Sequence, residues 1–235
     1  PAITARQECR RTPVVLDTPN NREAAMEQSI THFVRFGGLA AILAGAIFAV
    51  IQPIHPPDVV ESVTTGYWSL IVGLKYAMCF AFLIGVAALY LVQADRAGWI
   101  GLAGFVLFSL SWALQSGFVF TEVFVMPPLA VVSPDFVSSM LGLATSTAGP
   151  HSIGAMTPTY AFVGICYLLG GVLFGIATVW AKVLPRWPAV LLAVTALVTP
   201  AAVLLPHAIQ RLVAIPMGIA VIWLGYSLWG GRYRR

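Results

Sequence analysis

The sequence contains a succession of apolar segments, each about 20 residues long, that together occupy most of its length. A helix of about 20 apolar residues crosses a hydrocarbon core about 30 Å thick. Only 9% of the 235 residues are charged and 59% are hydrophobic, whereas a soluble domain carries about 25% charged residues. These features exclude a water-soluble globule. They predict an all-α fold, a six-helix transmembrane bundle.

The boundaries of the spans follow from prolines, interfacial aromatic residues and charged turns. Proline lacks the amide donor that a continuing helix needs, so Pro53, Pro127-Pro128 and Pro206 are predicted to end three spans. The polar turn 93–97 is predicted to join the second span to the third. The predicted spans are 34–52, 67–93, 99–126, 160–180, 187–205 and 212–229.

The long connection 127–157 contains a local helix signal. Ser133 is a good N-cap residue, Pro134 suits the first turn, and Asp135 places a carboxylate at the positive helix end. Apolar residues then recur on one side over two to three turns. We expect a short extracytoplasmic surface helix over 134–144, lying at the membrane surface.

Basic residues indicate the orientation of the bundle. With the N-terminus inside, eleven of the thirteen lie on the inner side, and only Lys75 and Arg211 lie elsewhere. The predicted outer loops carry Asp58, Glu61 and Asp135. The positive-inside rule therefore predicts a multi-pass protein with both termini cytoplasmic. The clustering of basic residues at span ends and termini also argues against nucleic acid as a partner, despite a sequence pI of 9.2.

Three regions are expected along the chain. Residues 1–30 are polar and are predicted to form a flexible cytoplasmic tail. Within them, residues 1–25 fit an extension upstream of an alternative start at Met26. Residues 31–230 form the six-span membrane domain, and 231–235 form a basic cytoplasmic tail.

Lys75 and Glu122 are ionisable groups inside apolar spans, where a charge costs about 2.5 to 3.5 kcal/mol. Side chains lean toward the N-terminus of their helix, and the two predicted helices run in opposite directions. The amine and the carboxylate therefore lean toward each other in depth. We expect a charged pair lining an outer cavity, with Gln115, Ser116 and Thr121 as further polar lining. The alternative is that Lys75 reaches the headgroups and Glu122 lies in water.

His55, His151 and His207 fall on the predicted outer side. Three histidines with an open fourth position would make a catalytic zinc site, and His55 with His207 would also suit a haem. No local spacing such as HExxH supports this, so three interfacial histidines are the simpler interpretation. Met126, Met140 and Met156 on the same side give a weak signal for a soft metal.

Three stretches carry a resemblance to known proteins: 167–175 (YLLGGVLFG), 183–188 (VLPRWP) followed by Leu191-Leu192, and 223–229 (WLGYSLW). They resemble bacterial multi-pass integral membrane proteins of unknown function, whose layout matches residues 30–230. The resemblance implies a bacterial cytoplasmic (inner) membrane and supplies no catalytic residues.

The leading hypothesis is a non-enzymatic protein of the lipid bilayer that binds or passes a small solute or lipid, with no cofactor predicted. Lys75 and Glu122 would serve as its gate or counter-ion pair. The second hypothesis is a metal enzyme or haem protein that uses the three histidines. The third is an accessory subunit of a larger membrane complex, or a homo-oligomer, because Gly170, Gly171 and Gly175 suit close helix contact.

Overall fold

A computed structural model describes residues 19–145, 147–205 and 207–233. The chain divides into two compact units, Pro1–His32 and Phe33–Arg235. The described part of the first unit is helical and belongs to helix α1, which begins at Pro19. Proline suits the first helical position because that amide has no partner in any helix. Residues 19–30 of the predicted tail are thus helical, and residues 1–18 lie outside the described residues.

The described regular elements are all helical, which confirms the predicted all-α fold. Five helical stretches are long and apolar enough to cross a membrane, and a shorter apolar helix accompanies them. The long helices are α1 (Pro19–Ile54), α3 (Gly66–Leu91), α4 (Ala94–Phe120), α7 (Met156–Ala181), α8 (Arg186–Val198) and α10 (Ile215–Trp229). The short elements are α2 (Val60–Val63), η1 (Thr121–Val125), α5 (Met126–Val132), α6 (Pro134–Thr145), η2 (Thr199–Leu204), α9 (His207–Gln210) and η3 (Arg211–Ala214).

The predicted end of the third span at Pro127-Pro128 is wrong, because the helical stretch continues to Val132. The five residues of η1 form a π-helix, and the amide of Met126 donates to the carbonyl of Thr121, five residues earlier. The two prolines then occupy the first turn of α5, where an amide donor is not needed. The π-helix therefore lets the chain pass two prolines without ending the helix.

The predicted fifth span is shorter as an α-helix than expected. Helix α8 ends at Val198, and the chain continues as the 3₁₀-helix η2 around Pro200. A 3₁₀-helix rises about 2.0 Å per residue, against about 1.5 Å in an α-helix. Together α8 and η2 extend for about 31 Å, close to the thickness of a hydrocarbon core. The expected surface helix is present as α6, which begins at Pro134 as predicted.

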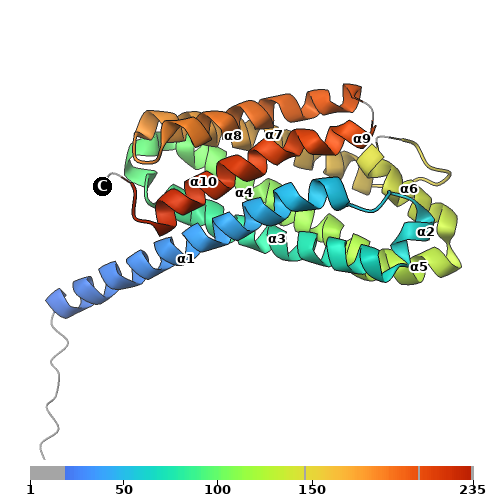
Figure 1. Cartoon of the computed structure of the whole chain (residues 1–235), viewed down its shortest axis with the longest axis horizontal. Helices are drawn as coiled ribbons and strands as arrows, with labels where there is room; N and C mark the ends of the chain where they lie inside the picture. The colour runs from blue at the N-terminus through green and yellow to red at the C-terminus, as the bar shows by residue number, and fades with distance from the viewer. Residues whose placement is uncertain (1–18, 146, 206, 234–235) are drawn as a thin grey trace, which may run out of the picture. The chain divides into compact units, whose positions relative to one another are not determined.

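In the second unit the long helices pack as antiparallel neighbours in chain order, and α10 returns to α1 (Figure 1). Helices α4 and α7 approach closely, through a reciprocal pair of contacts. A Cβ added at Gly104 would lie 2.4 Å from the backbone nitrogen of Phe174, and one at Gly170 would lie 2.3 Å from that of Phe108. Each helix thus places a glycine against a phenylalanine of the other. Only glycine permits such an approach of two backbones.

The same device joins α1 to α10. A Cβ added at Gly38 would lie 2.8 Å from the carbonyl oxygen of Gly225, and one at Gly45 would lie 2.5 Å from that of Gly218. At the α3–α4 turn, the Gln93 side chain is 2% exposed and donates to the Thr178 hydroxyl at 3.0 Å. Small residues and a buried polar contact therefore close the bundle from its middle to this end, which we call the closed end.

Candidate functional site

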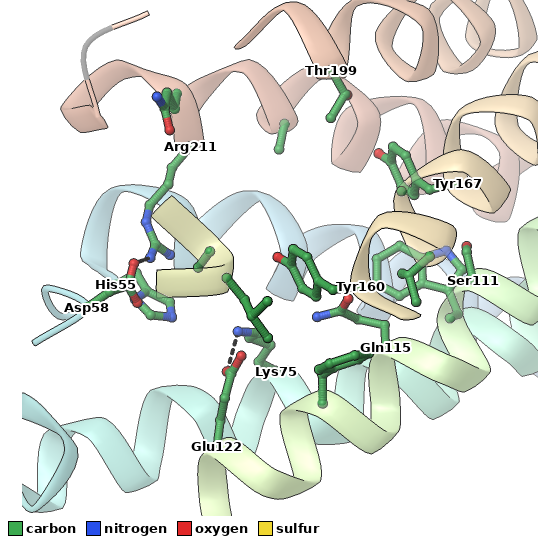
Figure 2. Close-up of a pocket in the computed structure, with 18 of the residues that line it drawn as sticks. His55, Asp58, Lys75, Ser111, Gln115, Glu122, Tyr160, Tyr167, Thr199 and Arg211 are labelled. Atoms are coloured by element: carbon green, nitrogen blue, oxygen red, sulfur yellow. Dashed lines mark hydrogen bonds and ion pairs between the residues drawn. The ribbon is translucent and has the colours of Figure 1, made fainter. Parts of the chain in front are cut away.

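The opposite end of the bundle contains a cavity of about 650 Å³. Its wall comes from the end of α1, the first half of α3, the end of α4 with η1, and from α6, α7, η2 and η3 (Figure 2). We call this the cavity end. The polar residues of the wall are Gln52, His55, Asp58, Lys75, Ser111, Gln115, Glu122, Tyr160, Tyr167, Thr199, Gln210 and Arg211.

Lys75 and Glu122 meet on this wall, which confirms the predicted pairing. The ammonium nitrogen of Lys75 lies 2.5 Å from Oε2 of Glu122 and donates to it. The side chains are 18% and 16% exposed, respectively. Figure 2 shows them facing each other from α3 and from the turn of helix that follows α4. Pairing offsets the cost of placing the two charges within apolar spans.

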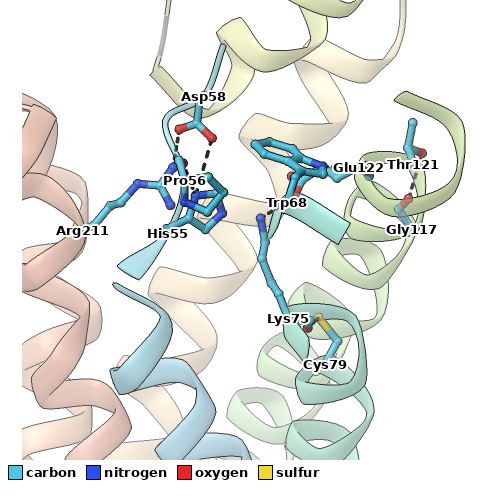
Figure 3. A network of polar contacts seen from close by, with 10 residues as sticks. All are labelled: His55, Pro56, Asp58, Trp68, Lys75, Cys79, Gly117, Thr121, Glu122 and Arg211. Atoms are coloured by element: carbon cyan, nitrogen blue, oxygen red, sulfur yellow. Dashed lines mark hydrogen bonds and ion pairs between the residues drawn. The ribbon is translucent and has the colours of Figure 1, made fainter. Parts of the chain in front are cut away.

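The π-helix η1 leaves the backbone carbonyl of Glu122 without its usual helical partner. In a regular α-helix the carbonyl of Glu122 would accept from Met126, but that amide donates to Thr121 instead. Pro127 has no amide hydrogen to replace it. The indole N–H of Trp68 donates to this carbonyl at 3.1 Å (Figure 3). The contact fixes the start of α3 against η1, and Lys75 follows two turns later on the same side of α3.

A second ion pair, which the sequence analysis did not identify, lies on the same wall. Arg211 in η3 donates to the carboxylate of Asp58, whose side chain is 6% exposed (Figure 3). The two residues are 153 positions apart, so no local motif links them. The available signal was charge distribution. Lys75 and Arg211 were the two basic residues left off the predicted inner side, and both are paired with carboxylates at the cavity.

His55 lies between the two ion pairs, with its side chain 2% exposed. Its Nδ1 donates to the carbonyl of Pro56 at 2.7 Å, because a carbonyl oxygen can only accept. Burial, followed by the charges of Lys75 and Arg211, lowers the pKa of His55 to about 4. The ring is therefore neutral near pH 7. Its Nε2 is then a bare acceptor, and it has no hydrogen-bond partner among the described residues.

The other predicted site residues divide into those that reach the cavity and those that do not. Gln115 lines it. The Ser116 and Thr121 hydroxyls donate instead to carbonyls of their own helix, Ala113 at 2.7 Å and Gly117 at 3.0 Å, and neither residue lines the cavity.

Of the three predicted metal-ligating histidines, His55 alone is seen to line the cavity. His151 is exposed and does not line it, and its backbone amide donates to the Ser139 hydroxyl at 3.0 Å. The side chain of His207 lies outside the described residues. Within the described part of the chain, no group of three His, Cys, Asp or Glu residues could hold a metal ion. The zinc and haem hypotheses stay predictions.

The rest of the wall is apolar and aromatic. Trp112 lines the cavity and stacks on Phe82, with ring centroids 3.8 Å apart and an interplanar angle of 7°. Phe48 meets the edge of Trp112 with centroids 5.6 Å apart. The methionines on the wall are Met78, Met126, Met140 and Met156. The cavity thus combines paired charges and a neutral histidine with a broad surface for an apolar group.

Comparisons of the chain with family models, curated proteins and solved structures find no match. Function is therefore inferred from the site itself. The arrangement can hold a molecule that has a polar and an apolar part. Ion pairs and a neutral imidazole on one wall supply hydrogen bonds, and rings and thioethers on the others supply contact area.

Proposed function

We propose that this protein binds a small solute or lipid in its cavity, and that the Lys75–Glu122 pair is the counter-ion pair that controls occupancy. The observation that carries the proposal is the position of that pair on the wall of a cavity of about 650 Å³. Ionisable groups within membrane spans mark binding or transport sites because they are too costly to keep as simple scaffold.

The charge balance of the wall supports binding rather than a purely structural role. Asp58 and Glu122 are matched by Arg211 and Lys75 among the described lining residues. A scaffold that needed only stability would gain by replacing such buried pairs with apolar residues of similar size. Balanced charges beside an open apolar volume instead suit a ligand that hydrogen-bonds to one wall.

We further propose that the cavity opens toward the outside of a bacterial inner membrane. The support is the distribution of basic residues. Arg96, Lys182 and Arg186 lie at the turns of the closed end. The two basic residues on the cavity wall are both neutralised by carboxylates. By the positive-inside rule, this distribution supports a cytoplasmic position for the closed end.

The test compares Lys75→Met, Glu122→Gln and the double variant for ligand retention and folding. Each protein is purified in nanodiscs, its bound small molecules are extracted and identified by mass spectrometry, and folded yield is measured by size-exclusion chromatography. Either single change leaves one buried charge unpaired, at a cost of about 3 to 5 kcal/mol, whereas the double change leaves none. We expect the double variant to fold, and we expect the small molecule that is extracted from the wild type to be absent from its extract.

Two results would contradict the proposal. One is a double variant that folds and retains the same molecules as the wild type. The other is that both single variants and the double variant lose folded protein equally, because the pair would then act only in folding.

Neither alternative function gains support from a specific contact. The accessory-subunit hypothesis was motivated by the glycines of α7, but these are occupied within the chain: Gly170 by α4, and Gly171 and Gly175 by α8. The hypothesis of a metal enzyme or haem protein is tested by metal analysis and a visible absorption spectrum of the purified protein. A stoichiometric metal that is lost in His55→Ala would favour it over the present proposal.

A further inference from the structure

We propose that the ligand is an uncharged, membrane-soluble molecule with a hydroxyl group, and that this hydroxyl donates to Nε2 of His55 while it accepts from the ammonium of Lys75. This inference rests on the proposed function, because it concerns the same cavity. It specifies the chemical class of the ligand and the atoms that recognise it.

The first half of the proposed contact is the bare nitrogen of His55. The bond from Nδ1 to the Pro56 carbonyl fixes the tautomer, so Nε2 presents a lone pair and no hydrogen. The edge of the ring also packs against Trp68, with centroids 5.8 Å apart. The ring is therefore held on both sides. A buried acceptor without a partner costs free energy, and a donor from a ligand would recover it.

The second half is the ammonium of Lys75. It carries three N–H donors, and the described structure gives it one acceptor, Glu122. Figures 2 and 3 both show the Lys75 ammonium and the His55 ring turned toward the same space. The positive charge of Lys75 also contributes to the lowered pKa of His55. A hydroxyl between them meets an acceptor on one side and a donor on the other.

The charge balance of the wall excludes ions as preferred ligands. Lys75 is paired with Glu122, and Arg211 with Asp58, so neither an anion nor a cation finds a free counter-charge among these four residues. An ion would have to compete with an existing partner and leave it unpaired. A neutral molecule disturbs neither pair.

The remaining wall defines the rest of the ligand. Beyond the two ion pairs the cavity is lined by rings and thioethers, including Phe48, Trp112, Phe118 and Met140. These surfaces favour an apolar body, and the methionines adapt to its shape. A molecule with a hydroxyl at one end and a hydrocarbon chain at the other is a lipid alcohol, which is the ligand class that we propose.

The test uses two probes with the same chain, 1-dodecanol and dodecyl methyl ether, in which a methyl group replaces the hydroxyl hydrogen and removes the donor. The protein in nanodiscs is titrated with tritiated 1-dodecanol in a proximity assay, with empty nanodiscs as background, and the unlabelled probes compete. Both oxygens accept from Lys75, but only the alcohol can donate to His55. We expect the ether to compete about tenfold less well, as for the loss of one hydrogen bond to a buried group.

The decisive variant is His55→Phe, which keeps an aromatic ring against Trp68 and removes the acceptor. The preference for the alcohol over the ether should fall from about tenfold to less than about twofold. His151→Phe, which changes an exposed histidine off the cavity, should keep the full preference. Dodecyl phosphate and dodecyltrimethylammonium should both compete less well than the alcohol.

Three outcomes would overturn the inference. Equal competition by alcohol and ether would refute the contact with His55 and leave the proposed binding cavity standing. Stronger competition by either charged probe would refute the neutral ligand class. Absence of saturable binding by 1-dodecanol would overturn the inference, and with unchanged ligand retention in the Lys75–Glu122 double variant it would overturn the proposed function as well.

Discussion

Two of the glycines of helix α7, Gly164 and Gly170, are six residues apart and have different surroundings. Gly170 at the closed end lies so near α4 that an added Cβ would stand 2.3 Å from the Phe108 nitrogen. Gly164 lines the cavity, and an added Cβ there would meet no atom within 4 Å. The closed end is held by backbone contact, and the cavity end is held by ion pairs and hydrogen bonds around an open volume. One helix therefore contributes both to close packing and to the cavity wall.

This difference matters in a membrane, where lipid chains are as apolar as the bundle interior. Helices then associate through close packing and polar contacts rather than through exclusion of water. The helices of the closed end associate through close packing, and those of the cavity end associate through polar contacts. The two ends of the bundle are therefore held by different kinds of contact.

The largest expected effect comes from filling the closed end. Gly170→Leu forces α4 and α7 apart because the clash is with backbone, and we expect a loss of about 3 kcal/mol or more in the free energy of unfolding. Gly117→Leu is the matched control, since a Cβ there meets nothing within 4 Å. Unfolding in mixed detergent and SDS micelles measures both. Equal stabilities would show that the close approach of α4 and α7 does not hold the bundle.

A smaller effect is expected from pH at the cavity end. Burial chiefly lowers the pKa of His55 from 6.5 to about 4. The unfolded chain therefore takes up a proton near pH 6.5, and the folded protein does so only near pH 4. The share of the free energy of unfolding that depends on neutral His55 is therefore fully present above pH 6.5. It is lost as the pH falls toward 4, and the loss is on the order of 3 kcal/mol.

The measurement is the free energy of unfolding from pH 7 to pH 4.5 in wild type, His55→Phe and His151→Phe. His55→Phe should show a shallower fall than the wild type, because it has no imidazole to protonate there. His151→Phe, at the exposed histidine, should fall as the wild type does. Parallel curves for wild type and His55→Phe would place the acid sensitivity elsewhere.

Much of the fold follows from local pattern. Run lengths and helix-ending residues predict the long helices, and the residues around Ser133 predict α6. The Lys75–Glu122 pairing follows from counting depth along two antiparallel spans and from the lean of helical side chains. These inferences succeed because each depends on residues close in the sequence, or on two spans joined by a short turn.

The rest depends on contacts that no local pattern records. The chain passes Pro127-Pro128 because a π-helix shifts the hydrogen bonds before them, and Trp68 satisfies the carbonyl that this frees. Thr121 points away from the cavity for the same reason that Glu122 points into it, since neighbouring helical positions face different directions. The Arg211–Asp58 pair joins two segments whose proximity only the packed bundle determines.

If the cavity is a binding site, the substitution Gly164→Leu, which fills part of it, should weaken ligand binding. A Cβ at this position meets nothing within 4 Å, the longer side chain adds bulk at the cavity wall, and leucine favours the helix more than glycine does. The measurement is saturable binding of tritiated 1-dodecanol by Gly164→Leu and by Gly117→Leu, at matched folded protein. We expect Gly164→Leu to bind about tenfold more weakly or worse, while Gly117→Leu binds as the wild type does. Equal binding by the two variants would contradict the proposed binding site.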